Sequence, residues 1–99
     1  MSPTLTSSSG KQVISLADFG PDVSGRGLGE SIRERVDAAV DEVIFDCAGI
    51  ETMSPSFADE LFGKLAVQEN RPANLRVANA SPDVTSVIRF AVRERQGEG

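Results

Sequence analysis

The segment Glu42–Ala66, EVIFDCAGIETMSPSFADELFGKLA, decides the fold because it predicts a strand, a short turn and a helix in direct succession. The strand is residues 43–45, VIF, an unbroken run of branched and aromatic residues typical of a strand covered on both faces. Asp46 ends this run, and Gly49 permits a turn. We therefore expect a central, parallel strand that leads into a helix at the carboxyl edge of a sheet, where functional residues of α/β domains usually lie.

The helix of this segment begins at Ser54-Pro55. A serine oxygen can accept hydrogen bonds from free backbone amides, and proline is well tolerated at the first helical position, so Ser54 is the predicted N-cap. Ser56 falls in the first turn, away from the apolar stripe, and we expect its hydroxyl to be exposed. The apolar stripe follows helical spacing and consists of Phe57, Ala58, Leu61, Phe62, Leu65 and Ala66. The opposite, polar side consists of Asp59, Glu60, Lys64 and Gln68.

The same alternation of strand and helix signals extends to both sides of this segment. Residues 12–16 predict an earlier strand, and a helix is expected over about Gly29 to Val40. Residues 75–77 predict a third strand, and Ser81-Pro82 repeats the helix start. The order β-α-β-α-β-α predicts a small α/β domain, with a mainly parallel or mixed sheet of three to four strands and helices packed on it. We assign residues 11–96 to this domain and residues 1–10 to a flexible tail or a weak edge strand.

Composition narrows the classes of protein that fit. The 99 residues allow one domain, and the single cysteine excludes an internal disulfide. The net charge of −5, with ten basic residues dispersed among fifteen acidic ones, argues against nucleic acid as a partner. The chain has no apolar run that would span a bilayer and no signal-peptide pattern at its amino end, so we expect a cytoplasmic protein without a membrane partner.

Few catalytic constellations fit this sequence. Because the chain has no histidine, it has no Ser-His or Cys-His nucleophile pair, and Cys47 alone makes no ordinary zinc site. Asp46 and Asp18 could together form an acidic Mg²⁺ pocket. We favour the alternative that Asp46 has a structural role and stabilises its own loop. We predict that Cys47 is a small, buried thiol of the core. We therefore predict no metal, no cofactor and no enzymatic activity.

A glycine-rich segment, residues 24–29 (SGRGLG), precedes the first predicted helix. Backbone amides of such a segment, with Arg26, Gly27 and Gly29, can cradle an anion. The segment lacks the full spacing of a dinucleotide-binding loop, and glycines in a linker more often serve flexible geometry. An anion or nucleotide sensor is thus the alternative function for this chain.

The strand, loop and helix start together resemble the STAS family, the fold of bacterial anti-sigma factor antagonists. In that family a strand ending in Asp and a loop with Gly lead into an Asp-Ser-Ser-Gly helix start, and Asp46 and Gly49 match the first two features. Counting onward places Ser54 at the family's Asp, Ser56 at its phosphorylatable Ser and Phe57 at its Gly. The run SFADEL, residues 56–61, is similar to a divergent STAS-like family of uncharacterised function. The likeness extends over about residues 11–95, including LRV at 75–77 and ASP at 80–82.

The resemblance implies a non-enzymatic protein-interaction module of the anti-sigma factor antagonist type. Its partner would be a regulatory ATPase or kinase that docks around Ser56, with Ser54, Glu51 and Asp59 in the same turn. Phosphorylation of Ser56 would add about −1.5 to −2 charges beside acidic side chains and weaken the partner's grip. A third hypothesis is a purely structural interaction domain without a switch, and the acidic composition fits it equally well.

Overall fold

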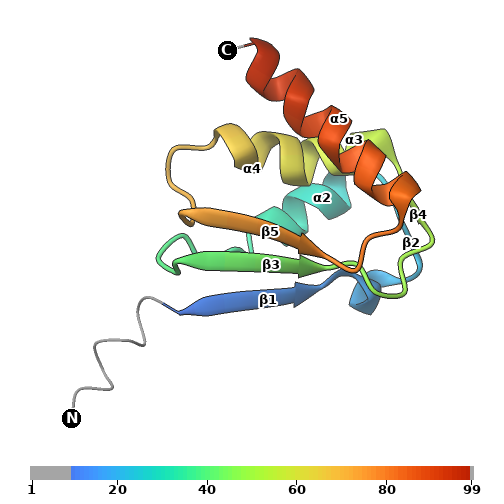
Figure 1. Ribbon diagram of the computed structural model, residues 1–99, viewed down its shortest axis with the longest axis horizontal. Coiled ribbons are helices and arrows are strands. Elements are labelled where there is room, and N and C mark those ends of the chain that lie inside the picture. Colours follow the sequence, from blue (N-terminus) through green and yellow to red (C-terminus); the bar gives the residue numbers. More distant parts are fainter. Residues whose placement is uncertain (1–9, 99) are drawn as a thin grey trace.

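The computed structural model describes residues 10–98 and is built on a three-stranded parallel sheet (Figure 1). The strands β1 (Lys11–Ser15), β3 (Glu42–Asp46) and β5 (Asn74–Ala78) pair in the order β1-β3-β5. The predicted central, parallel strand is therefore confirmed as β3. The tail or edge strand predicted for residues 1–10 lies outside the described residues except for Gly10.

Helices cover one side of this sheet (Figure 1). A single turn of 3-10 helix, η1 (Leu16–Phe19), follows β1, and α2 (Arg26–Arg33) precedes β3. A middle helix then runs through three consecutive stretches: α3 (Pro55–Ala58), the π-helical η2 (Asp59–Gly63) and α4 (Lys64–Val67). The chain ends in α5 (Pro82–Glu98). This is the predicted β-α-β-α-β-α order. None of the helices in residues 10–98 has the length and apolar character needed to cross a bilayer.

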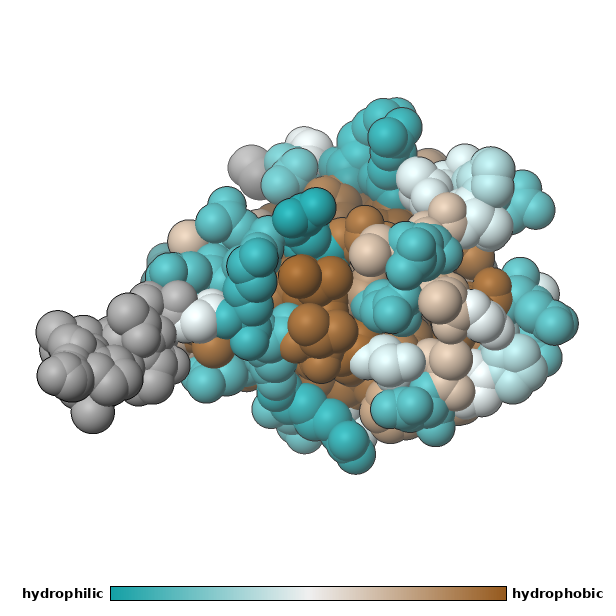
Figure 2. All heavy atoms as spheres, turned by 60° about the horizontal axis from the view of Figure 1, so that its bottom comes forward, coloured by the Kyte–Doolittle hydropathy of each residue, from teal (hydrophilic) through white to brown (hydrophobic). Residues whose placement is uncertain are grey.

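The other face of the sheet is open, so the prediction that β3 is covered on both faces is wrong. Val43 and Phe45 point to the helices and are fully buried, whereas Ile44 is half-buried on the opposite side. Its neighbour in the register, Val13, is 62% exposed. Figure 2 shows this face, with an apolar area bordered by hydrophilic side chains. The alternation of burial follows from the two-residue period of a strand whose helices all lie on one side.

The core lies between the sheet and the middle helix. The ring of Phe45 from β3 meets the ring of Phe62 edge to face, with centroids 5.0 Å apart and planes at 75°. The largest fully buried side chains are Phe45, Phe57, Leu16, Ile32, Leu61 and Leu65. The apolar stripe predicted for the middle helix is thus confirmed for its large residues.

Two strands of two residues each form a second parallel sheet that the sequence pattern did not predict. They are β2 (Asp22–Val23) and β4 (Thr52–Met53). The Glu51 amide donates to the carbonyl oxygen of Pro21 at 2.7 Å, and the Ser54 amide donates to that of Val23 at 3.0 Å. This small sheet fixes the residues before Ser54 against the residues before α2, and so positions the start of the middle helix.

The first long helix differs from its prediction at both ends. It begins at Arg26 rather than Gly29, directly after Gly25, whose φ of 91° is open to glycine but strained for other residues. It ends at Arg33 rather than Val40. Beyond that point the Gln12 side chain donates to the carbonyl oxygen of Arg35 at 2.8 Å and accepts from the Asp37 amide at 2.7 Å. Bonds from a distant side chain thus replace the backbone bonds that would continue the helix.

Candidate functional site

Ser54 is the N-cap of the middle helix, as predicted. Its hydroxyl oxygen accepts from the Phe57 amide at 3.1 Å, and Pro55 occupies the first helical position. The same oxygen accepts from the Gly25 amide at 3.2 Å. Ser54 therefore joins the start of the middle helix to the start of α2, in addition to capping its own helix.

Ser56 lies two residues further on, and its hydroxyl is 3.2 Å from that of Ser54. It is half-buried rather than freely exposed, because it forms part of the wall of a groove between the middle helix and α5. We call this hollow, of about 600 Å³, the Ser56 groove. Its lining residues are Arg26, Pro55, Ser56, Asp59, Ser86, Val87, Phe90, Ala91 and Glu94.

Phe90 is a large apolar residue of this groove that the sequence analysis missed. Its side chain is 59% exposed on α5, which is unusual for a large apolar residue. The signal in the sequence was its position, since Phe90 falls outside the stripe formed by Val84, Val87, Ile88 and Ala91. An aromatic residue off the buried stripe of an amphipathic helix marks a candidate contact surface.

Asp59 carries its charge in a paired state. The Arg95 guanidinium donates from Nε to Oδ1 at 2.7 Å and from Nη2 to Oδ2 at 2.9 Å, and Arg26 Nη1 donates to Oδ2 at 2.8 Å. These bonds, from Arg95 above all, hold the pKa of the Asp59 carboxyl well below its usual range. Asp59 thus ties α2, the middle helix and α5 together at the floor of the Ser56 groove.

Glu60, which the sequence pattern placed on the polar side, is instead buried between α2 and the middle helix, with only 5% of its surface exposed. Its carboxylate accepts from Arg33 Nη2 at 2.9 Å, Lys64 Nζ at 3.0 Å and Arg26 Nη1 at 3.3 Å. Burial opposes ionisation of Glu60, but the hydrogen bonds from Lys64 and Arg33 lower its pKa overall. Two carboxylates and four cations thus form one network around the middle helix.

Two glycines allow the helices to approach closely at this network. A Cβ atom on Gly29 of α2 would lie 2.9 Å from the Cβ atom of Glu60, and one on Gly63 would lie 3.1 Å from the carbonyl oxygen of Ala91 in α5. Between Asp59 and Gly63 the helix widens into η2, a π-helical turn of a kind that often occurs at functional sites. The sequence signal for this packing was glycine at two positions inside helices.

The family described as STAS-like domain of unknown function (DUF4325) matches residues 28–85, more than half of the chain. This chain belongs to that family. The match includes Ser54, Ser56 and Asp59, and it agrees with the likeness predicted from the strand and the helix start. No curated protein matches the chain significantly. No solved structure does so either.

In this STAS-like domain the glycine-rich segment is not an open loop. Arg26, Gly27 and Gly29 belong to α2, so the prediction of a loop over residues 24–29 is wrong in its boundaries. The Arg26 guanidinium is engaged by Asp59 and Glu60, and those hydrogen bonds raise its pKa. Anion binding at this segment stays a prediction, and a ligand would compete for Arg26 with two carboxylates.

Glu51 lies apart from the Ser56 groove. Its side chain is exposed just before β4, beside a smaller hollow of about 150 Å³ that it shares with Asp83 of α5. The structure therefore brings Ser54, Ser56 and Asp59 together with Arg26, while Glu51 stands at a neighbouring part of the same end of the STAS-like domain.

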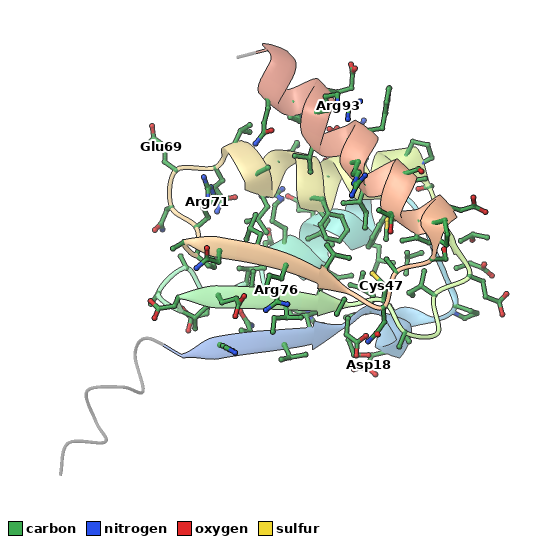
Figure 3. The ribbon with its side chains drawn as sticks, in the orientation of Figure 1. Asp18, Cys47, Glu69, Arg71, Arg76 and Arg93 are labelled. Atoms are coloured by element: carbon green, nitrogen blue, oxygen red, sulfur yellow. The ribbon has the colours of Figure 1, made fainter. Side chains whose placement is uncertain are left out.

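Asp46 and Cys47 have structural roles in the STAS-like domain. Oδ1 of Asp46 accepts from the Ala48 amide and from the Asn79 side chain, each at 3.0 Å, which confirms that Asp46 stabilises its own loop. Cys47 is buried, as predicted, and burial raises the pKa of its thiol to about 11. Figure 3 shows Cys47 and Asp18 near the carboxyl ends of the strands. Within residues 10–98, no cluster of acidic, cysteine or histidine side chains is arranged to hold a metal ion.

Proposed function

We propose that this STAS-like domain is a non-enzymatic protein-interaction module of the anti-sigma factor antagonist type. Its partner is a regulatory ATPase or kinase, which docks on the Ser56 groove and is released when Ser56 is phosphorylated. The observation that carries the proposal is the position of the Ser56 hydroxyl in the same groove as the exposed ring of Phe90.

Phe90 and its surroundings support docking by a protein. The wall of the groove formed by α5 includes Val87 and Ala91 beside Phe90, so a partner's apolar side chain would gain contact area there. Aromatic residues at the centre of an interface are frequent anchors of binding energy. The exposed carboxylate of Glu94 at the rim suits a basic side chain of the partner.

The local charges support a switch at Ser56. Asp59 is already neutralised by Arg95 and Arg26, so phosphate repulsion by Asp59 is weaker than the sequence alone suggests. The larger effect is on the apolar surface. A phosphate carries about −1.5 to −2 charges, and placing it in an apolar interface costs desolvation and disrupts docking. Phosphorylation would therefore weaken partner binding without unfolding the domain.

The test is affinity capture from a lysate of the source cells with four baits: wild type, Ser56→Ala, Ser56→Glu and the control Ser31→Glu. Ser31 is exposed on α2 and lies outside the Ser56 groove, so the control adds the same charge elsewhere. We expect a kinase-like ATPase to be retained by wild type, Ser56→Ala and Ser31→Glu and lost with Ser56→Glu. Equal retention by all four baits would refute the switch.

A second variant separates docking from the switch. Phe90→Ala removes the exposed ring without touching the fully buried core, so the fold should be retained while partner retention falls. A partner that Phe90→Ala retains fully does not use the groove. The domain is then incubated with the purified partner and Mg-ATP. Mass spectrometry of the product tests whether Ser56 is the phosphorylated residue.

A further inference from the structure

A second concave surface runs along the outer side of β5, on the flank of α5 that faces away from the Ser56 groove. It consists of three adjoining hollows of about 320, 390 and 530 Å³, and Ile88 lines all three. We call this surface the β5 groove. None of its lining residues lines the Ser56 groove.

The floor of the β5 groove is apolar. Leu75 and Val77 of β5 and Ile88 and Val92 of α5 form it. Val77 faces the helix side of the sheet, in register with the fully buried Phe45, yet it is 40% exposed because no further strand lies beside it. A strand side chain that faces the helix side of a sheet is normally covered. The exposure of Val77 therefore leaves room for an additional strand beside β5.

The main chain of β5 is unpaired along this groove. The Asn74 amide donates to the carbonyl oxygen of Asp41, and the Ala78 carbonyl oxygen accepts from the Cys47 amide, so these residues bond toward β3. In a parallel strand, alternate residues direct both backbone groups to the same neighbour. Leu75 and Val77 therefore direct their N–H and C=O groups to the open edge, and an open edge is a template for another strand.

Arginines form the rim of the β5 groove. Arg89 and Arg93 are exposed on α5 four residues apart, an arrangement of like charges that costs a helix stability. Within the described residues, neither one forms an ion pair. Among the described residues, Arg71, before β5, bonds the carbonyl oxygen of Pro72 alone. Figure 3 shows Arg71, before β5, and Arg93 on α5. In a chain of net charge −5, such a set of arginines favours an acidic ligand.

We propose that the β5 groove binds an extended, acidic segment of a partner protein, which adds to β5 as a strand. Its backbone pairs with Leu75 and Val77, its apolar side chains cover Val77, Ile88 and Val92, and its carboxylates reach the arginines of the rim. The unpaired backbone edge distinguishes a peptide from a nucleic acid, whose single strands usually bind through exposed aromatic rings. The one aromatic ring of this groove, Phe62, is only 4% exposed.

The test uses a fluorescein-labelled heptapeptide of alternating glutamate and valine, EVEVEVE, and fluorescence anisotropy with the whole chain. Two matched peptides separate the contributions: KVKVKVK reverses the charge, and ESESESE removes the apolar side chains. We expect EVEVEVE to bind and both others to bind at least about tenfold more weakly. Hydrogen exchange of the Leu75 and Val77 amides, followed by NMR, should slow when EVEVEVE is bound.

Variants locate the site. Arg93→Glu should weaken EVEVEVE binding at least about tenfold, whereas Lys11→Glu, the same charge change on exposed β1, should alter it by less than about twofold. Val77→Pro removes an edge N–H that has no internal partner, and it should abolish binding while the circular dichroism spectrum is retained. If Val77→Pro unfolds the domain, the affinity of Arg93→Glu for EVEVEVE still tests whether the peptide binds in the β5 groove.

Several outcomes would overturn the proposal. These are absence of EVEVEVE binding, equal binding of KVKVKVK, and unchanged binding to Arg93→Glu. Self-association of the free protein that Val77→Pro abolishes, measured by sedimentation, would assign the edge to a second copy of this chain. Tighter binding of an oligothymidylate that competes with EVEVEVE would assign the groove to nucleic acid.

Discussion

Two glycines of α2, two residues apart, should respond in opposite directions to the same substitution. A Cβ atom added to Gly29 would lie 2.9 Å from the Cβ atom of Glu60 and 3.0 Å from the carbonyl oxygen of Phe57. A Cβ atom added to Gly27 would meet nothing within 4 Å. Both residues are helical and neither has a positive φ, so alanine fits the backbone at both positions.

The magnitudes follow from these surroundings. Overpacking a core contact costs about 1–3 kcal/mol, and the upper end applies at Gly29 because one obstacle is main chain and the other carries a carboxylate held by Arg33 and Lys64. Alanine also stabilises the helix by about 1 kcal/mol relative to glycine, which offsets part of this cost. Gly29→Ala should therefore lower the free energy of unfolding by about 2 kcal/mol. Gly27→Ala has only the favourable contribution, about 0.5–1 kcal/mol.

Urea denaturation followed by circular dichroism measures both free energies, and thermal melts provide a second readout. For a domain of this size we expect Tm to fall by about 10 °C in Gly29→Ala and to rise by about 4 °C in Gly27→Ala. A Gly29→Ala protein as stable as the wild type would refute the close packing of α2 on the middle helix. Equal changes in both variants would show that helix propensity alone decides.

Three further predictions concern single residues. Ser54→Ala should lower the free energy of unfolding in urea by about 1 kcal/mol because the N-cap is lost, and no change would contradict the cap. Because the folded state depresses the Asp59 pKa below the ordinary 3.8, its contribution to stability is complete above that pH and is lost as the pH falls through the folded-state value. Urea titrations at several pH values should show a flatter acid limb for Asp59→Asn than for the wild type, and equal acid limbs would contradict the pairing of Asp59. With a pKa of about 11, Cys47 should resist a thiol reagent at pH 8 until urea unfolds the chain, and rapid labelling of native protein would contradict its burial.

Features that depend on local chemistry were predictable from the sequence. Ser54-Pro55 and Ser81-Pro82 act within one helical turn, and both serines accept the predicted capping bonds. The strand at residues 43–45 follows from an unbroken run of β-branched and aromatic residues, and the stripe of the middle helix follows from helical periodicity. These local signals also carry the resemblance by which the family was recognised.

Features that depend on distant contacts were not predictable. Glu60 appears on the polar side of an ideal helix, but the middle helix has neighbours on several sides, and its buried carboxylate needs cations supplied by α2. The early end of α2 depends on Gln12, which lies on β1. The strands β2 and β4 have two residues each, too few for an alternation to be recognised.

The two grooves lie along opposite flanks of α5. Phe90 and Glu94 face the Ser56 groove, and Arg89 and Arg93 face the β5 groove. Opposite charges on the two flanks favour a basic partner on one side and an acidic segment on the other. Arg95, whose guanidinium bonds Asp59 beneath the Ser56 groove, fixes the position of α5 against the middle helix. Any movement of α5 that closed one groove would therefore alter the other, so occupants of the two surfaces should influence each other's affinity by equal factors.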